Sequence, residues 1–341
     1  MGMWLCAVLL SQGAQAASSP PGCAPAVLLP LQTVLPGVAV VHGHWPAVEA
    51  ERPDHLATTV VLGQGAEVTV LDPGPSRRAG LALQNTLRCQ KQARVARVIN
   101  SHAHAEQVLA NSAFRAPVNA LAGTVQAMRQ RCPECLATLR QDLGALALQG
   151  TRIVRPHATL QEGQTLHIGG RVWQVQAMLH AHTESDLVLW SSGREGEPAR
   201  EGVVLVGGLV DGRWPVLAQG SVIGWLAALE RVQAMQPQWL IGQHVVAGPQ
   251  QVPQVLQRQR AYLCGLLGHA WRKLEQGQSE AEAVQGLALP APWPAPDAKQ
   301  AQAWRQQHMF NQFRAWREAE QMWLSEQAWP AACGSTPDIV R

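Results

Sequence analysis

The segment 101–107 has the residue types and the spacing of a metal site: Ser-His-Ala-His-Ala-Glu-Gln. It follows an apolar run at 95–99 and precedes another at 108–110, so we expect a strand, a short turn and then a helix. His102 and His104 stand two apart on an extended segment, which lets both imidazoles point the same way. Converging imidazoles bind transition metals, most often Zn²⁺. The segment therefore predicts metal chemistry at the end of a strand.

Four other segments carry polar or glycine residues at the ends of apolar runs. They have the sequences Val-Leu-Asp-Pro-Gly, His-Thr-Glu-Ser-Asp, Val-Leu-Val-Gly-Gly and Ile-Gly-Gln-His, at 70–74, 182–186, 204–208 and 241–244. In this order, together with the paired histidines, they resemble the motifs of the metallo-β-lactamase superfamily. The resemblance covers about residues 36–250. It implies an α/β fold of the metallo-β-lactamase-like kind, an αββα four-layer sandwich with the metal site at one edge.

The resemblance assigns His102, His104 and His182 as ligands of one Zn²⁺ ion. Three imidazoles leave a fourth position for water, and the metal lowers the pKa of that water toward about 7. The implied reaction is attack of a metal-bound hydroxide on an ester, lactone or thioester-like bond. Glu106 would be the general base, and His244 would bind the leaving group or a substrate oxygen.

The residues at the positions that hold a second metal in the family differ in this sequence. Glu106 replaces the family's Asp, Gln107 replaces a His, and Gly208 replaces the bridging Asp, so that only His244 is retained. A neutral amide competes poorly with water for zinc, and glycine offers no side chain. We therefore expect one Zn²⁺ per chain; Asp211, three residues beyond Gly208, is an alternative ligand if it can swing in.

Other polar residues near these motifs have expected supporting roles. Asp72, Thr183 and Asp186 match family positions and would orient the ligands through hydrogen bonds. His180, two residues before His182, is expected to support a ligand or to pack, with an extra ligand as the alternative. His42 and His44 are expected to be ordinary edge or loop residues.

Composition sets broad limits on the class of protein. The chain has 341 residues, 47% of them hydrophobic, which is enough for a substantial core. A net charge of +3 gives no electrostatic case for nucleic-acid binding. Residues 1–16 have a short apolar stretch and an Ala-Gln-Ala cleavage site, which predicts a signal peptide and a periplasmic protein. A buried N-terminal strand is the alternative, and no segment predicts a membrane span.

Six cysteines follow the predicted signal peptide, an even number that suits disulfides in an oxidising compartment. Cys132 and Cys135 form a Cys-Pro-Glu-Cys motif. A local structural disulfide is the favoured interpretation, with a redox site or a zinc site as alternatives.

The hydrophobic pattern divides the chain into four parts: a signal peptide at 1–16, a linker at 17–35, the metallo-β-lactamase-like domain at 36–250 and an all-helical C-terminal extension at 251–330. Strands are expected at 37–41, 58–62, 67–71, 95–100, 172–179, 187–190, 203–206 and 239–241. Helices are expected at 77–92, 118–130, 133–143, 221–235, 251–275, 279–287 and 298–326.

Within the superfamily, the chain is most similar to the group called quinoprotein relay system zinc metallohydrolases. The similar features are the Cys132–Cys135 region, the segment 211–229 and an Asn311, Arg314, Glu318 pattern in the last helix. That resemblance implies a link to periplasmic alcohol oxidation by enzymes that carry pyrroloquinoline quinone, with a quinoprotein or cytochrome as partner. Two hypotheses follow: a mononuclear zinc hydrolase of unknown small-molecule substrate, or an inactive metal-binding descendant that binds a periplasmic partner.

Overall fold

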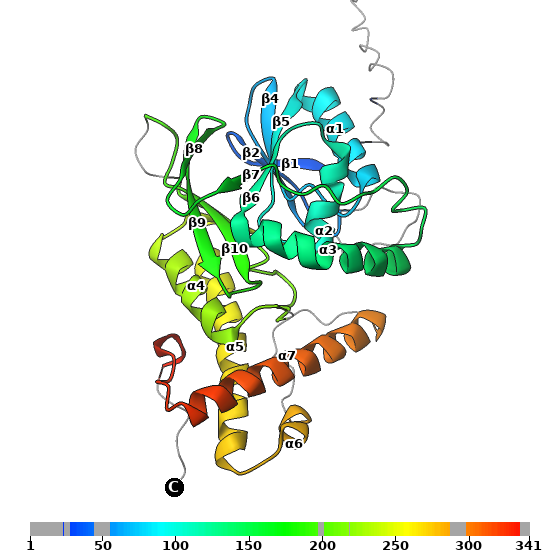
Figure 1. Cartoon of the computed structure of the whole chain (residues 1–341). Coiled ribbons are helices and arrows are strands. Elements are labelled where there is room, and N and C mark those ends of the chain that lie inside the picture. The colour runs from blue at the N-terminus through cyan, green and yellow to red at the C-terminus, as the bar shows by residue number, and fades with distance from the viewer. Residues whose placement is uncertain are drawn as a thin grey trace, which may run out of the picture.

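The computed structural model describes residue 23 and residues 28–43, 55–196, 201–217, 219–286 and 298–334. Two β-sheets lie next to each other, and helices cover their outer sides (Figure 1). The predicted signal peptide at 1–16 and His44 lie outside the described residues. Among the described helices, none is both long and apolar enough to cross a membrane.

The first sheet has seven strands in chain order, β1 to β7. The first four pair antiparallel, and β4 to β7 pair parallel. A parallel pair needs a crossover, and α1 (Arg77–Lys91) provides it between β4 and β5. The strands are β1 (Leu31–Leu35), β2 (Val38–Val41), β3 (Thr59–Leu62), β4 (Glu67–Leu71), β5 (Arg94–Ile99), β6 (Val118–Leu121) and β7 (Ala158–Leu160).

The second sheet has six strands in the order β13-β12-β11-β10-β9-β8. Only β11 and β12 pair parallel among them, and α4 (Val222–Ala234) is the crossover between these two. The strands are β8 (Thr165–Ile168), β9 (Arg171–Leu179), β10 (Ser185–Ser191), β11 (Val203–Gly207), β12 (Trp239–Gly242) and β13 (Val245–Ala247).

Alternating side chains divide the core into layers. In β3, Val60 and Leu62 pack between the two sheets, whereas Val61 packs outward against α1. In β11, Leu205 likewise faces the first sheet and Val204 faces the outer helices. Because the strands are buried on both faces, they form almost continuous apolar runs. The result is the predicted αββα sandwich.

The C-terminal part of the chain is helical, as expected. It contains α5 (Val252–Glu275), α6 (Glu280–Val284), α7 (Ala298–Leu324) and a final turn at Ala331–Cys333. Residues of α5 and α7 join the core on the outer face of the second sheet. A disulfide between Cys264 and Cys333 fixes the final turn to α5, and another joins Cys23 to Cys89.

Three local expectations differ from the structure. Residues 31–35, expected in the linker, form β1 because they pair antiparallel with β2. Residues 118–121, expected as helix, form β6, and a single α3 (Ala122–Leu143) with Pro133 inside it replaces two helices. Cys132 and Cys135, expected as a disulfide, are free thiols; one helical turn places them side by side, where they hydrogen-bond to each other.

Candidate metal centre

The site lies where strands of both sheets end. Asp72 follows β4 and Ser101 follows β5, its parallel neighbour, so both lie at one edge of the first sheet. Gly208 follows β11 and Gln243 follows the parallel β12, at one edge of the second sheet. The Leu187 N–H donates to the Ser101 carbonyl at 2.8 Å and joins the two sheets at this edge. Parallel pairing therefore brings distant motifs together.

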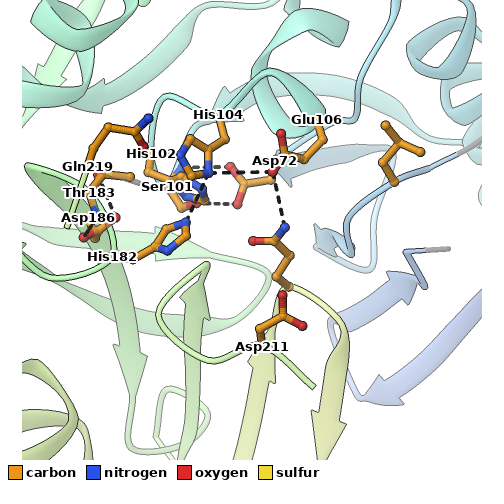
Figure 2. A network of polar contacts seen from close by, with 12 residues as sticks. Asp72, Ser101, His102, His104, Glu106, His182, Thr183, Asp186, Asp211 and Gln219 are labelled. Atoms are coloured by element: carbon orange, nitrogen blue, oxygen red, sulfur yellow. Dashed lines mark hydrogen bonds and ion pairs between the residues drawn. The ribbon is translucent and has the colours of Figure 1, made fainter. Parts of the chain in front are cut away.

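A hydrogen-bonded chain orients His102 (Figure 2). Its Nδ1 lies 2.8 Å from the Ser101 hydroxyl, which donates to Asp72 Oδ2 at 2.6 Å. Asp72 Oδ1 also accepts the Ser101 N–H at 2.8 Å. Burial raises the pKa of Asp72 to about 7, and the two bonds from Ser101 act in the opposite direction. With Nδ1 donating to Ser101, His102 Nε2 carries a lone pair, and this buried atom has no hydrogen-bond partner among the described residues.

His104 and His182 complete a cluster with His102. The ligand nitrogens of the three residues all lie within 4.8 Å of one another. His104 Nε2 lies 2.6 Å from Gln219 Oε1, an acceptor that requires the proton on Nε2 and leaves the lone pair on Nδ1. His104 Nδ1 in turn lies 3.1 Å from His182 Nε2. Three ring nitrogens thus converge on one point, and a divalent metal with imidazole ligands fits them.

The turn between β9 and β10 positions His182. Asp186 accepts both the backbone N–H and the hydroxyl of Thr183, each at 2.8 Å, and so fixes the residue next to His182. Burial raises the pKa of Asp186 to about 6. The Trp225 ring lies 5.1 Å from the His182 ring, edge to face. Asp186 and Thr183 therefore form a hydrogen-bonded turn beside His182, and their expected role in orienting this ligand stays a prediction.

The surroundings of the cluster favour the neutral form of its buried histidines. Burial, followed by the charge of neighbouring His104, holds the pKa of His102 and of His182 well below the usual value of 6.5. Only a neutral imidazole has a lone pair to offer a metal. Burial therefore keeps these two side chains in the protonation state that a metal requires.

Glu106 lies next to the cluster, in the short helix α2 (Ala105–Val108). Its Oε1 lies 3.7 Å from His104 Nδ1 and accepts a hydrogen bond from Gln243 Nε2 at 3.3 Å. The carboxylate is about one-fifth exposed, so water reaches it. Glu106 thus lies beside the histidine cluster, and its role as the general base stays a prediction.

Gly208 and Gln107 contribute no ligand. A Cβ at position 208 would lie 2.5 Å from His182 Nε2 and 2.9 Å from His102 Cε1, closer than any side chain can approach. The bridging carboxylate of the family therefore cannot be restored here without displacing the histidines. Gln107 is buried, and its Oε1 has no hydrogen-bond partner among the described residues.

His244 is held apart from the cluster. Its Nδ1 lies 2.9 Å from Asp211 Oδ1 and its Nε2 lies 2.7 Å from the Leu56 carbonyl. Arg213 Nη2 lies 2.6 Å from the same Nε2. Burial raises the pKa of Asp211, but His244 and Arg213 outweigh it and hold that pKa below its usual range. The predicted role of His244 toward the substrate stays a prediction.

The loop that carries Arg213 and Gln219 is held by α7. Asn311, Arg314 and Glu318 stand three and four residues apart, on one face of this helix. Asn311 bonds two backbone groups of the loop, Arg314 bonds one, and Glu318 caps the start of α4. Their partners are Pro215, Leu217 and Gly220, and then Ser221, Val222 and Ile223, at 2.8–3.2 Å.

Two adjoining cavities lead to the cluster. The inner one, of about 230 Å³, is lined by His104, His182 and Gly208. It shares Glu106, Asp211 and other lining residues with an outer cavity of about 610 Å³. The outer wall comes from α3 and from α7, and includes Cys135, Trp214 and Trp304. The two Trp rings stack 5.0 Å apart, so the C-terminal helices form part of the cavity.

His180 lies elsewhere than expected, and two polar residues of the site, Arg213 and Gln219, were not predicted from the sequence. His180 is exposed and has a left-handed backbone (φ 52°), so it neither packs nor supports a ligand. His42 is a partly buried residue at the end of β2, bonded to Gln32, in line with an ordinary edge residue. Gln219 and Arg213 reach the site from a loop, and no spacing in the sequence marks either as a site residue.

Known proteins of similar structure share the fold. No protein-family model and no curated protein sequence matches the chain. A β-lactamase domain protein from Burkholderia ambifaria superposes over 91% of this chain and 91% of its own, with 18% identity and a TM-score of 0.60. A metallo-β-lactamase from Pseudomonas aeruginosa in its mono-zinc form covers 69% of this chain and 96% of its own, with 15% identity and a TM-score of 0.51.

A third similar structure is that of an alkylsulfatase. A stereoselective inverting sec-alkylsulfatase from Pseudomonas sp. covers 84% of this chain, with 13% identity and a TM-score of 0.61. This chain spans only half of the alkylsulfatase. The chain therefore has the metallo-β-lactamase fold with a helical C-terminal region, as predicted.

Proposed function

We propose that this protein is a hydrolase that uses one zinc ion held by His102, His104 and His182. The observation that carries the proposal is the convergence of three ring nitrogens within 4.8 Å, at the inner end of an open cavity. Structural zinc sites are closed by a fourth protein ligand, whereas catalytic sites leave one position open. The described residues offer three ligands in this cluster, which favours the catalytic kind.

His102, His104 and His182 would hold the Zn²⁺ ion, which would lower the pKa of a water molecule toward about 7 and so supply a nucleophile at neutral pH. The chain's own part is to position and to move protons. Glu106 Oε1, 3.7 Å from His104 Nδ1, is placed to accept a proton. Gln243 orients this carboxylate through its 3.3 Å hydrogen bond.

The outer cavity indicates the kind of substrate. Its size, about 610 Å³, suits a small organic molecule, and the stacked Trp214 and Trp304 offer an apolar wall. An ester, lactone or thioester with an apolar part against these rings is the substrate class that we propose.

The test is a screen of esters, lactones and thioesters with zinc-loaded protein. Turnover that disappears with a chelator, returns with zinc and is absent in His182→Ala supports the proposal. If zinc binds fully and no such bond is hydrolysed, the hydrolase proposal is wrong.

The second candidate is an inactive metal-binding protein. The observation that favours it is the residues at two expected second-metal positions, since Gly208 has no side chain and Gln107 offers only a neutral amide. In that case zinc would stabilise the fold without supporting turnover. Thermal unfolding with and without zinc, measured beside the substrate screen, separates the two candidates.

We also propose that the protein is exported to the periplasm and acts near quinoprotein alcohol oxidation. The disulfides Cys23–Cys89 and Cys264–Cys333 support an oxidising compartment. N-terminal sequencing of the protein from a periplasmic extract should give a new terminus after Ala16. Loss of quinone-dependent alcohol oxidation on deletion of the gene would support the partner proposal, and unchanged oxidation would contradict it.

A further inference from the structure

A positive side chain lies where the family resemblance expects the ligands of a second metal. The residues that remain there are Glu106, Asp211 and His244, two acids and an imidazole, all within reach of the inner cavity or next to it. Two carboxylates at a partly buried site need a positive charge to balance them. The guanidinium of Arg213 supplies that charge.

Arg213 is held in this place by a backbone hydrogen bond and by close contact between its guanidinium and the His244 ring. Its Nη2 lies 2.6 Å from His244 Nε2 and 3.1 Å from His244 Nδ1. Its backbone N–H donates to Asp211 Oδ1 at 2.8 Å, and the same oxygen lies 2.9 Å from His244 Nδ1. The guanidinium therefore lies against the imidazole that the family uses as a metal ligand.

The backbone on either side of Arg213 is closely packed. A Cβ at Gly212 would lie 2.2 Å from the His244 carbonyl oxygen, and one at Gly242 would lie 2.1 Å from the Val210 carbonyl oxygen. Glycine at both positions lets the loop after β11 pack directly on the turn between β12 and β13. This contact brings the segment that carries Asp211 and Arg213 next to His244.

We propose that Arg213 takes the place of the second metal: its guanidinium excludes a second divalent cation and provides a fixed positive charge beside the single zinc. The proposal rests on the proposed one-zinc function. Arg213 lines the outer cavity, so a substrate can reach its charge. The site then fits a substrate with a negatively charged oxygen, such as a carboxylate, next to the bond that is cleaved.

The experiment compares zinc binding by wild type, Arg213→Met and Arg213→Lys in equilibrium dialysis. Met keeps much of the length of the side chain and removes the charge, whereas Lys keeps a charge. Wild type and Arg213→Lys should bind one zinc, and Arg213→Met should bind a second zinc at least tenfold more tightly than wild type does. Circular dichroism and the zinc content of the first site show that each variant is folded.

Acetate is the probe for the second part of the inference. Its binding to the protein loaded with Co²⁺, followed by the visible spectrum, should weaken about tenfold in Arg213→Met and stay close to wild type in Arg213→Lys. Two tightly bound zinc ions in wild type, an unchanged second affinity in Arg213→Met, or equal acetate binding in all three proteins would overturn the inference. Wild type that binds no zinc would instead refute the one-zinc function, so the two failures are distinguishable.

Discussion

The site has two halves, the histidine half (His102, His104 and His182) and the half around His244, and the ring nitrogens in the two halves have different partners. In the histidine half, the outer nitrogen of His102 is bonded to Ser101 and that of His104 to Gln219, and the inner nitrogens face one point. In the other half, both ring nitrogens of His244 already have partners in the protein. Outer partners thus orient two of the three ligands toward a common centre. A retained histidine is therefore not by itself a metal ligand.

The two halves also differ in charge. Burial holds His102 and His182 neutral, which suits a cation at their centre. Beside His244, the guanidinium of Arg213 lies 2.6 Å from Nε2, and its positive charge helps to lower the pKa of Asp211. A second divalent ion there would meet a resident positive charge. The histidine half thus offers free ligands to a metal, whereas in the half around His244 the guanidinium of Arg213 takes the place of a metal.

The largest expected effect is the loss of zinc in His182→Ala, because this variant removes one of three ligands. Zinc affinity, measured by competition with a chelator, should fall by well over the roughly 100-fold that outer partners contribute. His180→Ala is the matched control, since His180 lies two residues away and is exposed. Equal zinc binding in both variants would contradict the assignment of the histidine half.

Gly208→Asp should abolish zinc binding rather than create a second metal site. A carboxylate in this position restores the family residue, but its Cβ would lie 2.5 Å from His182 Nε2. We expect the variant to lose zinc and about 1–3 kcal/mol of stability, as overpacked sites do. Gly208→Ala should behave similarly, because the collision begins at Cβ. A stable Gly208→Asp protein with two zinc ions would show that the histidines can move aside.

Glu106→Gln tests the residue that connects the two halves. Removing the proton acceptor should lower kcat by about 10²–10⁴-fold while one zinc stays bound. The control is Glu134→Gln, since Glu134 lines the same outer cavity without contact to the histidines. Zinc content is measured on each sample, so a loss of metal cannot be mistaken for a loss of the base. Undiminished turnover in Glu106→Gln would exclude it as the base.

Gln219→Ala should weaken zinc binding less than His182→Ala does. Its Oε1 accepts from His104 Nε2 at 2.6 Å, and outer partners of this kind are worth about 10–100-fold in metal affinity. Gln219→Glu keeps an acceptor and should recover most of the affinity. If Ala and Glu bind zinc equally, the hydrogen bond to His104 does not orient the ligand.

The last prediction concerns how the stability of the metal-free protein depends on pH. The pKa of His102 and of His182 is depressed in the folded chain, so the unfolded chain binds more protons below the ordinary value of 6.5. The contribution of these two histidines to the stability of the metal-free protein should therefore be fully present above pH 6.5 and fall below it, by up to about 1.4 kcal/mol per pH unit for each histidine. Urea unfolding between pH 7.5 and 5 measures this slope. The raised pKa values of Asp72 and Asp186 act in the opposite direction over this range and are common to both proteins. The test is therefore a difference: between pH 7.5 and 5, His182→Ala should lose less stability than the wild type does, and equal changes in the two proteins would contradict a buried neutral His182.

The fold was largely predictable from the sequence because the motifs follow buried strands. Asp72, His102 and Gly208 each come directly after or close to an apolar run, and the structure gathers them at one edge. The misses have local causes. The strand β6 at 118–121 is short and runs straight into α3, so its apolar residues fit a helical period as well as an extended one.

The partners of the histidines were less predictable. Gln219 contacts His104 across 115 positions, and Arg213 contacts His244 across 31 positions. A single sequence has no periodicity that connects such distant residues. The Asn311, Arg314 and Glu318 pattern was visible in the sequence, but its contact with the loop before α4 depends on how α7 packs, which helical spacing cannot give.

The most direct test is a zinc-edge anomalous difference map from crystals grown with excess zinc. We predict one peak per chain, within bonding distance of His102 Nε2, His104 Nδ1 and His182 Nε2, and none beside His244, where Arg213 should stay in place. An empty position among the three histidines, or a second peak bound to His244 and Asp211, would contradict a site with one metal half and one half filled by the protein.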